Sequence, residues 1–545
     1  MKSVMSHQFS QVPRAEIQRS SFNRSHGYKT TFDAGYLVPV FLDEALPGDT
    51  FNLKMSTFAR LATPVAPFMD NVFLDSFFFA VPYRLVWDNW QKFNGEQRDP
   101  GDSTDFLIPQ MVAPTSTGYA VGSLSDYFGI PTGVANLSHS SLFHRAYNLI
   151  WNEWFRDQNL QDSVTVDRDD GPDSPSDYVL LKRGKRHDYF TSCLPFPQKG
   201  PAVELPLGTS APISGSAPVL GLGKYNSTFA SHSVPVLESI GTTTYSTCAQ
   251  ITGGSASEYF YVDRNAVNGN PNLRADVTGL TADLSAATAA TINSLRQAFQ
   301  LQRLYERDAR GGTRYTEIIR SHFGVVSPDA RLQRPEYLGG GSAPVNIHPI
   351  AQTSSTDATS PQGNLAAMGT VASRGNGFSK SFTEHCLIIG LVCVRADLNY
   401  QQGLNRMFSR SSRFDFFWPA LAHIGEQAVL NKEIYAQGPA VLDDGEVVDD
   451  KVFGYQERFA EYRYKPSVIT GQFRSTYATT LDYWHLAQKF TGLPTLGADF
   501  IQENPPIDRV IAVPSEPHFL FDAYFDFVTA RPMPTYSVPG LVDHF

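Results

Sequence analysis

The chain has 545 residues and a mass of 60.3 kDa, and 42% of its residues are hydrophobic, which excludes a wholly disordered protein. Its net charge is −10, so the chain as a whole is not a polycation and any nucleic-acid contact must come from local basic patches. Only 18% of residues are charged, whereas Gly (41), Pro (36), Phe (38) and Tyr (24) are frequent, a composition that favours strands and loops over helix bundles.

The first 30 residues are polar and unpatterned, with a net charge of +4, and predict an extended basic arm. They contain no apolar run typical of a signal peptide. The longest apolar run of the chain, Cys386–Val394, has nine residues, against about 20 for a membrane helix. We therefore expect a soluble protein. The four cysteines are far apart and form no CxxC pair, so we expect buried thiols rather than disulfides or a zinc site: Cys193, Cys248, Cys386 and Cys393.

Regular elements follow the arm. The alternation in Phe51–Leu61 predicts a strand, and Val72–Tyr83 is apolar on both faces apart from Asp75 and Ser76, as in a strand covered on both sides. Apolar residues at helical spacing predict a helix over Ser138–Asp157, with Ser138 as its N-cap. Two charged loops come next, the acidic Asp167–Asp177 and the basic Lys182–His187. The aspartates of the acidic loop do not have the spacing of a calcium-binding loop.

The composition changes between Pro201 and Ala290, where Ser, Thr, Gly and Pro supply 36 of 90 residues and only nine are charged. The stretch is too long for an ordinary loop and contains a strand-like segment, Glu258–Val262. An inserted, exposed module is the favoured interpretation, and a linker rich in Pro, Ser and Thr is the alternative.

The second half of the chain predicts five further elements. These are a helix from Ala286 or Thr291 to about Ala309, a long loop over Ser342–Ser379, a buried strand in Ser381–Asp397, an acidic turn at Asp443–Asp450 and an alternating strand in His518–Pro532. The domain limits that follow are 1–50 for the arm and entry segment, 51–200 and 291–545 for the body, and 201–290 for the insertion.

No catalytic motif is present. The spacing needed for GxSxG, a P-loop, GxGxxG or HExxH fails at each near match, and the 13 histidines are scattered. We therefore expect neither an enzyme nor a cofactor or metal requirement.

Three basic patches are candidate nucleic-acid contacts, because guanidinium and ammonium groups pair with phosphates and aromatic rings stack on bases. Core packing is the alternative for the third, Leu404–Trp418, because its arginines alternate with aromatic residues. In Asn293–Ser321 we favour salt bridges instead, either between subunits or within the chain. The candidates are Arg14, Arg19, Arg24 and Lys29 in the arm, Lys182, Arg183, Lys185 and Arg186 in a second patch, and Arg406, Arg410 and Arg413 in the third.

Long blocks of the sequence resemble the major capsid protein of gokushoviruses, small single-stranded-DNA phages of the Microviridae. These blocks bracket nearly the whole chain, and Pro201–Ala290 is the stretch without a matching motif. They are Phe22–Phe51 (FNRSHGYKTTFDAGYLVPVFLDEALPGDTF), Phe77–Gly95 (FFFAVPYRLVWDNWQKFNG), Glu306–Gly340, Arg413–Tyr435 (RFDFFWPALAHIGEQAVLNKEIY) and Ala530–Phe545 (ARPMPTYSVPGLVDHF).

The resemblance implies an all-β fold, an eight-stranded viral jelly roll with long inserted loops and a few helices. It also implies sixty copies in a T=1 shell around circular single-stranded DNA, assembled in the bacterial cytoplasm with small internal DNA-binding or pilot proteins. The acidic loops then face outward or across subunits, where they do not repel the genome. The insertion becomes a three-fold protrusion that binds a host receptor, with candidate residues Tyr225, Tyr245, Tyr259, Tyr261 and Arg264. A jelly-roll carbohydrate-binding attachment protein outside the shell is the alternative.

Overall fold

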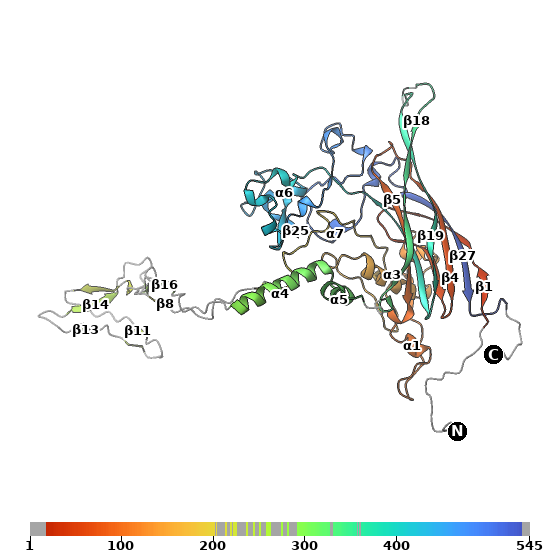
Figure 1. Ribbon diagram of the computed structural model, residues 1–545, viewed down its shortest axis with the longest axis horizontal. Coiled ribbons are helices and arrows are strands. Elements are labelled where there is room, and N and C mark those ends of the chain that lie inside the picture. Colours follow the sequence, from red (N-terminus) through yellow and green to blue (C-terminus); the bar gives the residue numbers. More distant parts are fainter. Residues whose placement is uncertain are drawn as a thin grey trace. The chain divides into compact units, whose positions relative to one another are not determined.

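The computed structural model describes residues 18–201, 203, 292–326, 331–356, 358 and 361–536, together with short strand segments between 213 and 282. The chain divides into two compact units. The body unit comprises Met1–Gly200 and Tyr305–Phe545, and the inserted unit comprises Pro201–Leu304. Most of the regular structure is β-strand, arranged in antiparallel sheets with few helices (Figure 1).

The first large sheet of the body unit has six antiparallel strands, in the order β1-β27-β4-β19-β18, with β2 following β1 along the same edge of β27. Alternate residues of β4 and β27 are buried, which is the pattern of a sheet with one face against the core. The strands are β1 (Ser20–Asn23), β2 (His26–Phe32), β27 (Phe519–Arg531), β4 (Thr50–Leu61), β19 (Leu365–Ser381) and β18 (Asn346–Ala351).

The second large sheet has four antiparallel strands in the order β17-β5-β20-β3. All eleven residues of β20 are buried, because both faces of this sheet are covered. The strands are β17 (Glu336–Pro344), β5 (Val72–Pro82), β20 (Cys386–Ala396) and β3 (Val38–Ala45). Numbered one to eight in chain order, the strands β2, β3, β4, β5, β17, β19, β20 and β27 are arranged 1-8-3-6 in the first sheet and 2-7-4-5 in the second.

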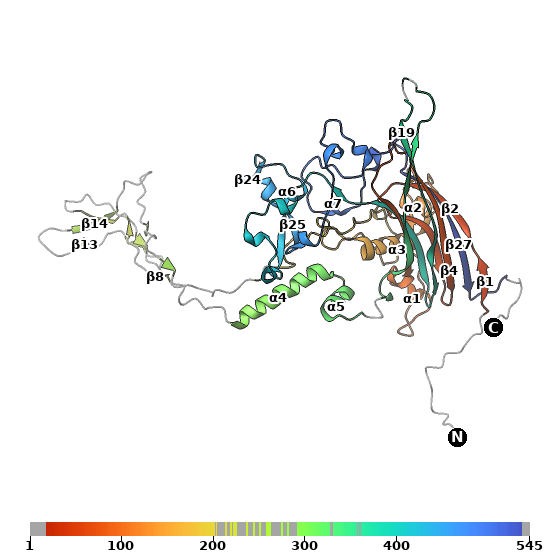
Figure 2. The same ribbon diagram turned by 45° about the horizontal axis from the view of Figure 1, so that its top comes forward.

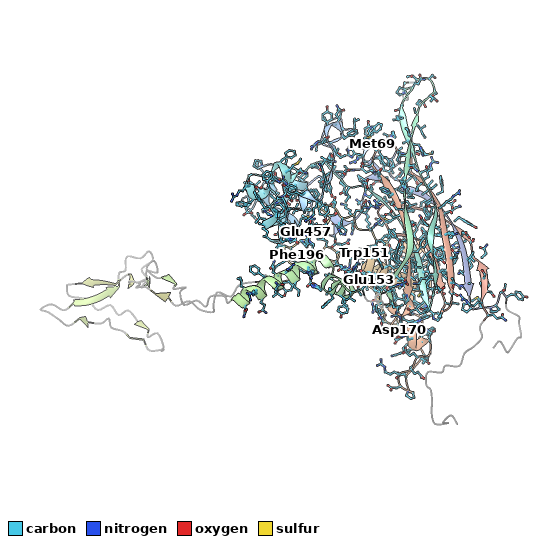
Figure 3. The ribbon with its side chains drawn as sticks, viewed as in Figure 1. Met69, Trp151, Glu153, Asp170, Phe196 and Glu457 are labelled. Atoms are coloured by element: carbon cyan, nitrogen blue, oxygen red, sulfur yellow. The ribbon has the colours of Figure 1, made fainter. Side chains whose placement is uncertain are left out.

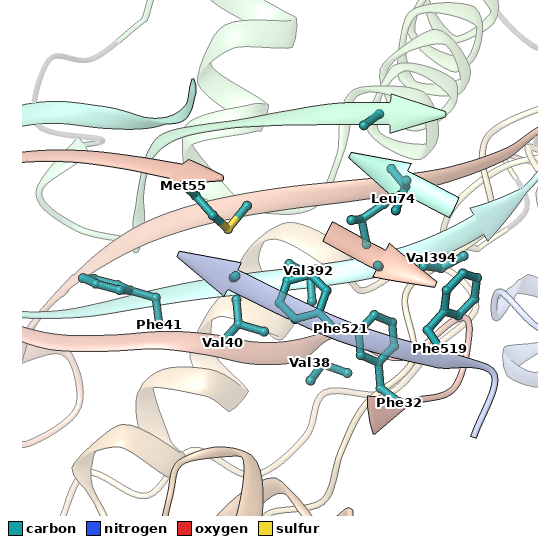
Figure 4. Close-up of a cluster of buried hydrophobic side chains, with 14 of the residues drawn as sticks. Phe32, Val38, Val40, Phe41, Met55, Leu74, Val392, Val394, Phe519 and Phe521 are labelled. Atoms are coloured by element: carbon teal, nitrogen blue, oxygen red, sulfur yellow. The ribbon is translucent and has the colours of Figure 1, made fainter. Parts of the chain in front are cut away.

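The main core lies between the two sheets and is rich in phenylalanine (Figure 4). Phe41 on β3 contacts rings of the opposite sheet, with centroid distances of 5.1 Å to Phe525 and 5.3 Å to Phe527. Phe32 stacks on Phe519 at 5.8 Å. The contacts of Phe41 join the two sheets face to face, whereas Phe32 and Phe519 are neighbours within the six-stranded sheet.

A second core covers the outer face of the four-stranded sheet. Helix α3 (Leu142–Ile150) packs there with Tyr147 and Ile150 against Phe79 and Leu387 (Figure 1, Figure 2). The six-stranded sheet differs, since Phe58, Leu520 and Tyr524 on its outer face are more than half exposed. Shorter elements in this region are α1 (Trp90–Phe93), β6 (Gln110–Val112), α2 (Leu124–Tyr127) and β7 (Ser138–Ser140).

A third, smaller core surrounds the two-stranded sheet of β22 (Glu426–Leu430) and β25 (Val452–Glu457). Helix α6 (Asn431–Ile434) follows β22, and a hairpin of β23 (Leu442–Asp443) and β24 (Glu446–Val447) precedes β25. The remaining elements are α4 (Ile292–Gly311), α5 (Tyr315–Phe323), α7 (Ala498–Ile501) and the parallel pair of β21 (Asn399–Tyr400) and β26 (Ser467–Val468).

Three expectations from the sequence are wrong. The first 30 residues were expected to form an extended arm, but β1 and most of β2 lie within them and pair with β27 in the six-stranded sheet. The helix predicted over Ser138–Asp157 begins later, because Ser138–Ser140 pairs with β6 and the N-cap is Ser141. The α-helix ends at Ile150 and continues as a π-helical turn to Phe155. Ser342–Ser379, expected as a long loop, contains the end of β17, all of β18 and most of β19. Its glycines permit close strand contact: a Cβ on Gly377 would lie 2.0 Å from the Leu53 carbonyl oxygen.

The described strands of the inserted unit pair locally and antiparallel. A three-stranded sheet has the order β10 (Leu222–Tyr225), β14 (Glu258–Val262) and β13 (Gln250–Ile251), and β14 coincides with the predicted strand-like segment. The other pairs are β11 (Val236–Leu237) with β12 (Thr244–Tyr245), β15 (Arg274–Ala275) with β9 (Val219–Leu220) and β16 (Thr281–Ala282) with β8 (Ile213–Ser214).

Candidate nucleic-acid and subunit interfaces

The basic residues of the arm differ in the partners they find. Arg19 is exposed and donates hydrogen bonds to the Gly48 carbonyl (2.7 Å) and the Thr50 hydroxyl (3.0 Å). Arg24 forms a two-point ion pair with Asp43 (2.5 and 3.0 Å), and Lys29 pairs with Asp522 at 2.6 Å. Arg14 lies outside the described residues. Among the described arm residues, Arg19 therefore retains the most uncompensated charge.

The second basic patch is held by contacts within the chain. Lys182 donates to the Asn504 side chain at 2.9 Å, and Arg183 forms an ion pair with Asp75 at 2.5 Å. Lys185 is buried, its ammonium lies 4.6 Å from the centroid of the Phe500 ring, and burial lowers its pKa to about 8 against the opposing charge of Glu503. Arg186 lies over the Phe73 ring at 5.8 Å. Arg183 and Arg186 thus anchor the segment to β5 of the four-stranded sheet, and Lys182 and Lys185 attach it to residues 500–504.

The acid at the centre of that anchor is Asp75 on β5, which also pairs with Arg395 on β20 at 2.7 Å. Burial alone would raise the pKa of Asp75, but hydrogen bonds from Ser342, Arg183 and Arg395 outweigh it and hold that pKa below its usual value. The sequence carried a signal for this pairing, since one Asp in an otherwise apolar, doubly covered strand requires a cationic partner. Arg395 itself was not among the predicted site residues.

The third patch is an exposed aromatic surface, not a core segment. We define the aromatic surface as Met407, Phe408, Phe414, Phe416, Phe417, Trp418, Ile424 and Tyr462, whose side chains are 50–71% exposed. The core alternative considered for this run is therefore wrong. Single exposed apolar residues are ordinary, whereas seven large ones between residues 407 and 424, with Tyr462 in contact with Phe417, make this segment a candidate interaction site.

The aromatic surface is held in one conformation by polar contacts behind it. The Trp418 indole donates to the Arg413 carbonyl at 2.9 Å, and Arg458 donates to the Phe414 carbonyl at 3.0 Å. Arg410 lies over two rings, 5.2 Å from Phe416 and 4.5 Å from Tyr462. A surface ordered in this way loses little conformational entropy when it binds a partner.

The arginines of this segment are unequal in charge balance. Arg406 pairs with the buried carboxylate of Glu433 at 3.0 Å, and Arg410 lies 3.6 Å from Glu461. Arg413 makes a cation–π contact with Phe414 at 4.7 Å. Within the part of the chain that the structure describes, it has no carboxylate partner. Arg413 is therefore the free cation of the three.

The prediction of subunit or intrachain salt bridges in Asn293–Ser321 is confirmed within the chain for two of its six arginines. Arg310 pairs with Glu426 at 2.5 Å, and Arg314 pairs with Glu153 at 3.2 Å. Figure 3 shows Glu153 among the side chains beside α5.

The register of the inserted unit brings together three of the predicted receptor-binding tyrosines. Tyr225 on β10 lies opposite Tyr259 on β14, and Tyr261 follows two residues later on β14. Opposite residues, and residues two apart, share one face of an antiparallel sheet. Tyr245 lies on β12, and Arg264 lies outside the described residues.

The described part of the chain contains no cluster of three or more potential metal-ligating side chains. No helix among the described residues is long and apolar enough to cross a membrane. Cys193, Cys386 and Cys393 are buried free thiols, as expected, and burial raises the pKa of Cys393 to about 12. Cys248 lies outside the described residues.

A buried histidine makes the second core sensitive to acid. Burial, and then the charge of His139, lower the pKa of His144 to about 3, whereas an unfolded histidine titrates near 6.5. The neutral form is the one that folds, so its stability contribution is complete above about pH 6.5 and is lost as the pH falls toward 3. We expect the free energy of unfolding to fall by about 2 kcal/mol between pH 7.5 and pH 5 from this group.

The His144→Gln variant tests that expectation. Gln retains a partner for the Ser125 hydroxyl, which lies 2.9 Å from His144 Nε2, but does not titrate. Urea midpoints of the parent and the variant should therefore differ in pH dependence between pH 7.5 and 5. Equal losses in both proteins would show that His144 does not determine the acid sensitivity.

Comparison with known proteins agrees with the resemblance found in the sequence. Residues 10–541 match the family model described as capsid protein (F protein). The chain is similar to the capsid protein VP1 of three viruses, with 52% identity for Bdellovibrio phage phiMH2K, 47% for Chlamydia phage 1 and 37% for Spiroplasma virus 4. The matches cover 99%, 99% and 98% of this chain, and 98%, 98% and 97% of the respective relatives.

Proposed function

This chain belongs to the capsid protein (F protein) family, and from that premise we propose that sixty copies of it close a T=1 shell around a circular single-stranded DNA genome. It is a structural protein of the virion and not an enzyme. The observation that carries this assignment is the match over nearly the full chain. For the same reason, a separate attachment protein outside the shell is not favoured.

Sedimentation of the purified full chain, with electron imaging of the fast fraction, tests the shell. Sixty copies of 60.3 kDa correspond to a particle of about 3.6 MDa. A round, nuclease-protected particle of that mass is the expected result. Species that stay between a monomer and a trimer under all conditions, without nucleic acid, would contradict assembly by this chain alone.

The strand order supports an eight-stranded viral jelly roll. Strands arranged 1-8-3-6 and 2-7-4-5 in two facing antiparallel sheets form two Greek keys wound around one core. The long connections between these strands, including the inserted unit, then supply the surfaces through which neighbouring copies meet.

The genome contact is proposed to lie in the arm, at Arg14 and Arg19, because Arg24 and Lys29 already pair with carboxylates. Neutralising the pair (R14Q with R19Q) should leave the body folded but reduce nuclease-protected DNA per particle by about two-fold or more, with a larger loss at higher salt. The matched control, R98Q with K489Q, removes two exposed charges outside the arm. Equal DNA retention in both variants would contradict the proposal. Small internal DNA-binding or pilot proteins would share the genome with the arm.

Host attachment is proposed for the inserted unit. The grouping of Tyr225, Tyr259 and Tyr261 on one sheet face supports it, because tyrosines contribute large contact areas at low entropic cost. Replacing all three by Ala should reduce adsorption to host cells about ten-fold or more while particle yield is unchanged. Loss of particles instead would assign this face to contacts between subunits.

A further inference from the structure

The aromatic surface lies at one end of the two-stranded sheet of β22 and β25. Ile424 lies two residues before the first residue of β22. Strand β25 ends at Glu457, next to Arg458, whose guanidinium donates to the Phe414 carbonyl. Figure 3 labels Glu457 at this position. Its carboxylate pairs with Arg463, so it does not neutralise Arg413 or Arg458. This end of the sheet therefore combines exposed rings with two arginines that lack carboxylate partners in the described chain.

The opposite end of the same sheet carries the acidic hairpin, which we define as Val441–Val447. Its turn, Asp444-Gly445, has positive φ angles of 53° and 81°, as a tight hairpin turn of the Asp-Gly type requires. Leu442, on the first strand of the hairpin, is 58% exposed. Asp444 and Glu446 are exposed and have no ion pair among the described residues, whereas Asp443 pairs with Lys451 at 2.5 Å.

The hairpin is firmly attached, as a docking element must be. The buried carboxylate of Asp449 accepts hydrogen bonds from the amides of Gln437 and Gly438, both at 2.8 Å. Lys432 of α6 pairs with Asp450 at 2.7 Å. The loop on each side of the hairpin is therefore fixed to the β22–β25 sheet.

The two ends are complementary in charge and in apolar character. We propose that the acidic hairpin of one copy docks on the aromatic surface of the next copy, with Leu442 against the rings and the carboxylates of Asp444 and Glu446 facing Arg413 and Arg458. This assignment rests on the capsid function proposed above and names the surfaces through which two subunits meet.

Geometry requires two copies for this contact. The six residues of β25 span about 20 Å between the hairpin and the Glu457 end of the sheet, where Arg458 contacts the Phe414 carbonyl, so one chain does not bring these two ends together by itself. A contact between two different surfaces is head-to-tail, and such contacts repeat around a rotation axis until a ring closes. A closed shell is built from such rings.

The same observations favour a protein partner over single-stranded nucleic acid. Bases stack on open ring faces, but Arg410 covers Phe416 and Tyr462, and Arg413 covers Phe414. The carboxylates of Glu461 and Glu433 neutralise Arg410 and Arg406. Two arginines without carboxylate partners among the described residues, Arg413 and Arg458, then remain beside exposed apolar side chains, a combination that suits an apolar, acidic hairpin.

A charge reversal on each side, followed by their combination, tests the contact in the full-length protein. We expect Arg413→Glu and Glu446→Arg each to reduce the yield of fast-sedimenting particles at least ten-fold. The double variant R413E/E446R restores an attractive pair and should return the yield to within about three-fold of the parent. The matched control, Arg98→Glu, reverses one exposed charge outside both surfaces and should assemble like the parent.

The outcomes separate this contact from the wider function. If the single variants assemble normally, or if the double variant is no better than the singles while all share the parent's urea midpoint, the contact is overturned. Normal particles with reduced DNA in R413E would assign the surface to nucleic acid and also overturn it. Failure of the parent to form particles in any setting would count against the proposed shell function itself.

Discussion

We expect the Asp173→Ala variant to lose about 3–5 kcal/mol of unfolding free energy, because it removes the buried counter-ion of a buried arginine and leaves only the exposed carboxylate of Asp169, at 3.3 Å. Arg145 lies on α3 with its side chain fully buried. Its Nε donates to Asp173 at 2.7 Å, and one terminal nitrogen donates to the carbonyls of Val86 (3.1 Å) and Asp169 (2.8 Å). The hydroxyl of Tyr178 completes the site with a 2.7 Å bond to Asp173.

The Arg145–Asp173 ion pair also predicts that the protein loses stability in acid. Burial alone would raise the pKa of Asp173, but hydrogen bonds from Arg145 and Tyr178 and the arginine charge outweigh burial and hold that pKa below its usual value. A depressed pKa in the folded state means that the contribution is complete above the unfolded value near 4. It is lost as the pH falls through the folded value.

Urea denaturation of the full chain at pH 7 measures the effect. Asp162→Ala, an exposed acid in the preceding loop, is the matched control and should change stability by less than about 0.5 kcal/mol. Adding Arg145→Met to Asp173→Ala removes the buried charge that has lost its buried partner and should recover part of the loss. A midpoint for Asp173→Ala equal to that of Asp162→Ala would contradict the structural role of the pair.

This pair also marks a limit of inference from sequence. An arginine in the apolar helix sequence LFHRAYNLI signals a buried cation, but the following acidic loop offers five aspartates, and only the fold selects Asp173, 28 residues away. Strands with regular alternation, such as β27, or continuous burial, such as β20, were predictable to within a few residues. In β19 the glycines and serines that allow close strand packing have the composition of a loop, and the strand was missed.

The candidate interfaces were predictable in the same uneven way. Basic residues identify candidate phosphate contacts, but their ion-pair partners lie far along the chain, as Arg183 shows with Asp75. The aromatic run at Leu404–Trp418 has the composition of a core and lies on the surface. A core and an interface bury the same kinds of side chain, so only the three-dimensional arrangement separates them.

The contrast between a buried and an exposed phenylalanine separates folding from assembly. We expect Phe41→Ala to lower the free energy of unfolding by about 3–5 kcal/mol, because removing the ring leaves a cavity between the two sheets. Phe41 is 2% exposed and contacts Phe78, Phe525 and Phe527, so relaxation of the neighbours fills little of that cavity. The urea midpoint should fall and the particle yield should fall with it.

Phe408→Ala makes the same chemical change at a residue that is 71% exposed on the aromatic surface. There is little packing to lose in the free chain, so the free energy of unfolding should change by less than about 0.5 kcal/mol. If the surface docks a second copy, the particle yield nevertheless falls, because the ring is buried only in the assembly. Normal assembly by Phe408→Ala would remove that ring from the contact. A large change in its midpoint would show that it stabilises the fold rather than the shell.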